Sequence, residues 1–112
     1  MVSDTKTYPV GQATSVTLEV TYGDADPGST VTTWQGVVEK VVPGSSKSYS
    51  RTPLRGAILF CRSSVKDENP TTNHTCVTYK LSGGPETREY YYELTVPADG
   101  AIADYSINFV FV

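Results

Sequence analysis

Apolar and polar residues alternate along several stretches of the chain, with the two-residue period of β-strands that have one buried face. Between residues 14 and 22 the apolar face consists of Val16, Leu18, Val20 and Tyr22. The same alternation recurs at 88–96 and 105–112. No window follows the period of about 3.6 residues that indicates an amphipathic helix. The pattern therefore predicts an all-β protein.

Glycine and proline separate the apolar stretches, which favours tight turns between successive strands. The strands are expected at 14–22, 30–42, 56–62, 75–81, 88–96 and 105–112. Six or seven strands in a chain of 112 residues predict an antiparallel β-sandwich of immunoglobulin or fibronectin type III size. Residues 1–13 are mostly polar and are expected to be a flexible or edge lead-in to a single domain at 14–112.

Both cysteines, Cys61 and Cys76, flank a polar stretch that also contains the sequon Asn73-His74-Thr75. A disulfide between them would close this stretch as a loop, and Asn73 could carry an N-glycan, so the chain is expected to be extracellular. Two buried, reduced cysteines in a cytosolic protein are the alternative. The polar start of the chain lacks an export signal, so secretion further requires that a signal peptide has been removed and that Met1 was added for expression.

The charge and the residue inventory exclude several kinds of function. A formal net charge of −3 and the absence of any Lys/Arg run argue against nucleic-acid binding, and no apolar run is long enough to insert into a membrane. His74 is the only histidine, so neither a Ser-His-Asp arrangement nor a zinc site with four Cys and His ligands can be assembled. Carboxylate pairs such as Asp67 with Glu68 are expected to be solvated. No enzymatic activity and no cofactor are expected.

Two aspartates in the turn 23–29, Asp24 and Asp26, have the spacing of calcium ligands. An EF-hand loop that began at Asp24 would need a glutamate at its twelfth position, where the chain has Gln35. A solvated turn is therefore the main interpretation, and these aspartates are only weak candidates for metal binding.

Aromatic residues are the strongest binding candidates, since the chain has eight tyrosines and one tryptophan. Trp34 could cover the sheet or serve as a platform for a ligand, and Tyr49 lies in a Ser-rich segment expected to be a mobile loop. In the run of three tyrosines at 90–92, Tyr91 must point to the opposite face from its neighbours. An outward aromatic ring beside hydroxyl groups can stack on a sugar or form part of a flat protein interface.

The segment 87–100, Thr-Arg-Glu-Tyr-Tyr-Tyr-Glu-Leu-Thr-Val-Pro-Ala-Asp-Gly, is followed by a final apolar strand at 104–111. Together they resemble the C-terminal hairpin of fungal immunomodulatory proteins, in which a strand ends in a Pro-Asp turn. A divergent, glycosylated and disulfide-bonded member of the kind found in jelly fungi fits best. The resemblance implies a secreted sandwich, often a homodimer, that engages cell-surface glycans or receptors and activates immune cells such as macrophages.

The expected function is therefore non-enzymatic recognition, immunomodulatory or lectin-like, with a cell-surface glycan or receptor as partner. The alternative is a structural or adhesive sandwich module, or an inhibitor of a secreted enzyme. Glycan binding or cytokine release would favour recognition, whereas self-association or enzyme inhibition without a glycan signal would favour the alternative.

Overall fold

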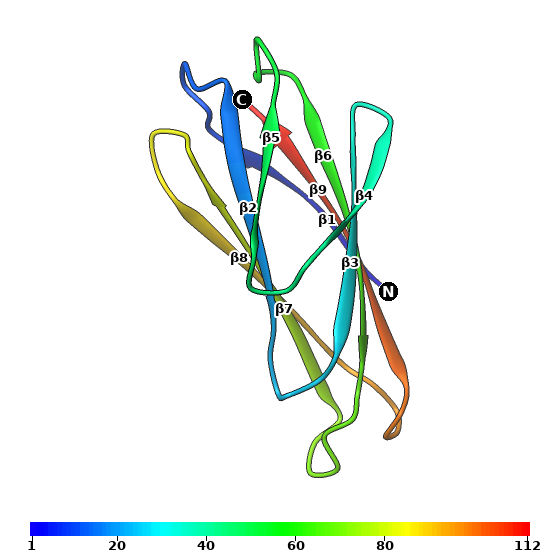
Figure 1. Cartoon of the computed structure of the whole chain (residues 1–112). Coiled ribbons are helices and arrows are strands. Elements are labelled where there is room, and N and C mark those ends of the chain that lie inside the picture. Colours follow the sequence, from blue (N-terminus) through cyan, green and yellow to red (C-terminus); the bar gives the residue numbers. More distant parts are fainter.

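A computed structural model describes all 112 residues. The chain forms nine β-strands joined by turns and loops, and no helix (Figure 1). The strands are β1 (Val2–Tyr8), β2 (Ser15–Tyr22), β3 (Gly28–Trp34), β4 (Val37–Val41), β5 (Ser46–Ser50), β6 (Ile58–Lys66), β7 (His74–Ser82), β8 (Arg88–Thr95) and β9 (Ile102–Phe111). The expected all-β sandwich is confirmed, with nine strands in place of six or seven. No segment forms a helix long and apolar enough to cross a bilayer.

Two sheets make up the sandwich. The first has the strand order β1-β9-β6-β3-β4 and the second β5-β2-β7-β8. Every pairing is antiparallel except that of β1 with β9. The order β9-β6-β3-β4 matches the G-F-C-C′ order of variable-type immunoglobulin sheets. Here, however, the chain forms β7 and β8 in the other sheet before it returns as β9.

Residues on the facing sides of the two sheets form one core of 21 buried residues. The alternation in β2 and β9 predicted this correctly, since Val16, Leu18 and Val20 are buried and so are all the inward positions of the last strand. β9 has neighbours on both sides, β1 and β6, which explains why so apolar a strand ends the chain. Burial of these side chains is the main contribution that holds the sheets together.

Hydroxyl groups also join the two sheets inside the core. Ser63 of β6 hydrogen-bonds through Oγ to Thr30 Oγ1 at 2.7 Å and to the Tyr79 hydroxyl of the facing sheet at 2.6 Å. Thr30 also contacts the Tyr22 hydroxyl, which extends the chain of hydroxyls back to the second sheet. These bonds satisfy polar groups that would otherwise be costly to bury.

Several segments differ from the elements that the sequence predicted. The strand expected at 30–42 is a hairpin of β3 and β4, and the Ser-rich segment expected to be a loop contains the edge strand β5. Residues 2–8, expected to be a flexible or edge lead-in, are the edge strand β1. The stretch between the cysteines was predicted to be one loop, but β6 continues to Lys66 and β7 begins at His74. The loop itself is therefore only residues 67–73.

Candidate functional site

A groove of about 450 Å³ lies where the two sheets part at their edge strands β4 and β5. Figure 1 shows the connection between these strands crossing from one sheet to the other. The groove is lined by side chains of β3, β4 and β5 that the alternation along each strand directs toward the space between the sheets, and several of them are polar. They include Thr32, Trp34, Glu39 and Lys47. Because the core is not closed here, the side chains of Trp34, Glu39 and Lys47 are available to a ligand, whereas Thr32 is buried beneath them.

Trp34 and Tyr49, two of the sequence candidates, meet in this groove. Their rings pack edge to face with centroids 5.6 Å apart, and Trp34 also packs at 5.6 Å against Phe111 of the core. Tyr49 is buried, and its hydroxyl hydrogen-bonds to Thr32 Oγ1 at 2.7 Å. Burial raises the pKa of Tyr49 to about 12. Tyr49 therefore supports the indole ring, while Trp34 remains partly exposed to the groove.

Polar side chains line the rest of the groove. Lys47 of β5 and Glu39 of β4 form an ion pair that links the two edge strands. The side chain of Glu39 is about half exposed, so it keeps acceptor capacity for another donor. Gln35 lies in the tight turn between β3 and β4, where its backbone has a positive φ of 50°. Such a mixture of one aromatic surface and a few convergent polar groups is typical of small-ligand sites.

Tyr91 lies far from this groove, on β8 at the opposite edge of the second sheet. It is 55% exposed and faces away from Tyr90 and Tyr92, as the alternation predicted. Its hydroxyl donates to Glu93 Oε2 at 3.1 Å. The structure therefore separates Tyr91 from Trp34 and Tyr49.

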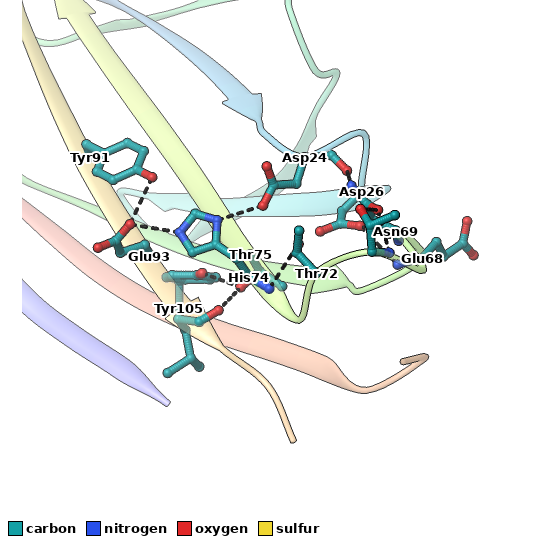
Figure 2. Close-up of polar contacts among 12 residues, drawn as sticks. Asp24, Asp26, Glu68, Asn69, Thr72, His74, Thr75, Tyr91, Glu93 and Tyr105 are labelled. Carbon is teal, nitrogen blue, oxygen red and sulfur yellow. Dashed lines mark hydrogen bonds and ion pairs between the residues drawn. The ribbon is translucent and has the colours of Figure 1, made fainter. Parts of the chain in front are cut away.

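His74, the first residue of β7, lies between two carboxylates (Figure 2). Its Nδ1 is 2.6 Å from Asp24 Oδ2 and its Nε2 is 2.8 Å from Glu93 Oε2. Hydrogen bonds to Glu93 and Asp24 raise the pKa of His74. The hydrogen bond between His74 and Glu93 also lowers the pKa of Glu93. Since a neutral imidazole can donate from only one nitrogen, this arrangement suits the charged form. With both nitrogens engaged, His74 does not present a free base.

The two aspartates weighed as calcium ligands point in different directions. Asp24 pairs with His74, whereas Asp26 is buried and accepts hydrogen bonds through Oδ1 from the backbone N–H groups of Glu68 and Asn69, at 2.9 and 3.1 Å. Asp24 and Ala25 have positive φ values of 57° and 56°, which are uncommon outside glycine. The turn expected from the sequence is present, but it is only partly solvated, because Asp26 is buried.

The expected disulfide between Cys61 and Cys76 is wrong, because both cysteines are free and buried. Cys61 lies on β6 and points into the core between the sheets, whereas Cys76 lies on β7 of the other sheet and faces outward. Gly23 covers Cys76 so closely that a Cβ there would be 2.2 Å from its sulfur. The second sheet therefore lies between the two thiols, which keeps them apart, so sequence proximity misled the prediction.

Asn73, the sequon residue, lies in the loop between β6 and β7 and is partly buried. With its amide nitrogen turned toward the neighbouring carboxylates, it donates to Asp99 Oδ1 at 3.0 Å and to Asp67 Oδ2 at 3.1 Å. The nitrogen that a glycan would occupy thus has two partners inside the protein.

Sequence reasoning missed several residues of these sites. Lys47 and Glu39 gave no signal, because they come close only when β4 and β5 lie at adjoining edges of different sheets. Asp67 was considered only as a solvated partner of Glu68, yet it is fully buried. The one available signal was the polar residue at an inward strand position, as at Thr32, where an apolar side chain is expected.

Comparisons of the chain with protein families, with curated proteins and with solved structures find no match.

Proposed function

We propose that this protein is a non-enzymatic recognition module that binds a sugar ring of a cell-surface glycan in the Trp34 groove. The observation that carries the proposal is a partly exposed indole, held by Tyr49, beside the charged pair of Glu39 and Lys47. An aromatic face packs against the apolar side of a sugar ring, while polar groups bind its hydroxyls. Six of the nine lining residues are polar, which suits a hydroxyl-rich ligand better than an apolar one.

The extracellular setting is part of this proposal. It no longer depends on a disulfide or on glycosylation of Asn73, whose amide is engaged inside the protein. What supports it is the resemblance of residues 87–111 to fungal immunomodulatory proteins. Activation of immune cells would follow if the bound glycan belongs to a receptor. Cytokine release from macrophages treated with the purified, endotoxin-free chain tests this step separately from glycan binding.

A glycan array followed by titration of the best ligand tests the groove. Trp34 is the only tryptophan, so its fluorescence should change as the ligand binds. Trp34→Phe and Glu39→Gln should each weaken binding by about tenfold, since they remove indole area and an acceptor without emptying the core. Tyr91→Ser, at an exposed tyrosine on the opposite edge, is the matched control and should bind like the unaltered chain.

Two results would contradict the proposal. One is the absence of any array signal above background from a folded chain. The other is a glycan whose binding survives both groove substitutions but is lost with Tyr91→Ser, which would move the site to β8.

A structural or adhesive role is the second candidate, and one feature favours it. The edge strand β4 and the residue after it expose Val37, Val38 and Val42, each more than half exposed. An exposed edge rich in β-branched residues can pair with the edge of another chain. Sedimentation analysis that finds concentration-dependent self-association, abolished by Val38→Lys and accompanied by no glycan binding, would favour this role.

A further inference from the structure

Three loops meet at the end of the sandwich opposite the C-terminus (Figure 1). They are residues 23–27 between β2 and β3, 67–73 between β6 and β7, and 96–101 between β8 and β9. Backbone hydrogen bonds hold the last two together: Gly100 N donates to Asp67 O at 2.7 Å, and Val96 N donates to Asn73 O at 2.8 Å. The loops carry the aspartates at positions 24, 26, 67 and 99.

Two of these aspartates are buried, and each has a carboxylate oxygen without a hydrogen-bond partner. Asp26 is 6% exposed; its Oδ1 accepts from two backbone N–H groups, as Figure 2 shows, but its Oδ2 has no partner. Asp67 is 0% exposed; its Oδ2 accepts from the Asn73 amide, but its Oδ1 has no partner. Buried polar atoms are rarely left unpaired, so these two oxygens require an explanation.

No lysine or arginine neutralises this cluster. The ion pairs of the molecule do not include Asp26, Asp67 or Asp99. Burial, followed by the charges of Asp26 and Asp99, raises the pKa of Asp67. A buried carboxylate without a counter-charge is costly, so either a proton or a cation must compensate.

The hydrogen bonds favour a cation. Asp26 accepts from fixed backbone N–H groups, and Asp67 and Asp99 accept from the Asn73 amide, which are contacts that stabilise the ionised form of a carboxyl group. One shared proton would neutralise a single carboxylate, whereas a divalent cation neutralises two. Carboxylate oxygens are the ligands that hard cations prefer.

We propose that a calcium ion binds at this end of the sandwich through the unpaired oxygens of Asp26 and Asp67. No three acidic, histidine or cysteine side chains form a metal cluster by themselves, so backbone carbonyls and water must supply the remaining ligands, as calcium sites allow. This role differs from the one weighed from the sequence: Asp24 is committed to His74, and the second carboxylate comes from a loop some forty residues further along the chain. The ion would link the β2–β3 loop to the β6–β7 loop.

Calcium titration of the full chain, freed of metal with a chelator at about pH 7, tests the site. Saturating calcium should raise the thermal midpoint by about 5 °C, and equilibrium dialysis should find one ion per chain. Asp67→Asn keeps the size of the side chain and its bond to Asn73, and it should weaken calcium binding by about tenfold or more. Glu68→Gln, at the adjacent exposed carboxylate that pairs only with Lys66, is the matched control and should bind normally.

The proposal fails if the folded chain shows no saturable response to millimolar calcium, or if Asp67→Asn responds as the unaltered chain does. It also fails if Asp67→Asn is simply more stable than the unaltered chain without calcium, and calcium adds nothing to either, because a shared proton would then explain the pair. Should Asp67→Asn not fold, Asp26→Asn and dialysis of the unaltered chain provide the same decision.

Discussion

Ser63→Ala should destabilise the fold far more than the loss of one small polar atom suggests. Ser63 is buried, and its Oγ is the only link between Thr30 on its own sheet and Tyr79 on the facing sheet. Thr30 keeps its contact with Tyr22, but the Tyr79 hydroxyl has no other hydrogen-bond partner. The substitution removes two hydrogen bonds and leaves one buried hydroxyl unpaired. Together these should cost about 3 kcal/mol, a large part of a stability of about 5–15 kcal/mol.

Urea unfolding monitored by the fluorescence of Trp34 measures this change. With a slope of about 1.5 kcal/mol per molar urea, the midpoint should fall by about 2 M. Ser64→Ala is the control: its neighbouring hydroxyl is exposed and bonds only to Asp104, so the cost should stay within about 0.5 kcal/mol.

A double-mutant cycle with Tyr79→Phe decides whether the hydrogen bond is the cause. Tyr79→Phe removes the hydroxyl that Ser63→Ala would leave unpaired, so the double variant should be more stable than the sum of the two single effects by at least about 1 kcal/mol. Strictly additive effects, or a cost for Ser63→Ala below about 1 kcal/mol, would refute the argument from buried hydroxyl pairing.

Two further predictions concern titratable groups. Because the folded-state pKa of His74 lies above its unfolded value, its pairs with Asp24 and Glu93 stabilise the fold fully below about pH 6.5, and this contribution is lost as the pH rises through the folded pKa. Unfolding of the unaltered chain and His74→Gln should therefore differ more at about pH 5.5 than at about pH 9, and an equal difference at both would count against it. Burial raises the pKa of the Cys61 thiol, so Cys61 and the covered Cys76 should resist a thiol reagent in the native state, yet denaturation should release two thiols per chain. A denatured chain with no reactive thiol would mean that the cysteines are bonded.

The edge strands β1 and β5 could not be recognised as strands from the sequence. β1 reads as a polar lead-in because only its last residue, Tyr8, is fully buried, and β5 reads as a Ser-rich loop because only Tyr49 is buried. Both strands owe their structure to backbone pairing, β1 with β9 and β5 with β2. Backbone hydrogen bonds place few demands on side chains, so a polar edge strand leaves little trace in the sequence.

The candidate sites were only partly predictable for a related reason. Trp34 and Tyr49 could be named as unusual aromatic residues, but their contact depends on how β3 and β5 of different sheets face each other. The link between Asp26 and the backbone at 68–69 likewise joins loops far apart in sequence. The residue types identified candidate site residues, but their contacts with one another depend on packing between segments far apart in the sequence.

The sequence by itself determined the fold class and the inward faces of the apolar strands, because a period of two residues assigns each side chain in a strand to one face or the other. It did not determine which sheet a strand joins. That assignment, made by the tertiary structure, put Cys61 in the core and Cys76 on the outer face of the opposite sheet. It also opened the Trp34 groove and brought Asp26 and Asp67 to the same end of the sandwich. Alternation is a local property, whereas strand partners are set by the burial of all strands together.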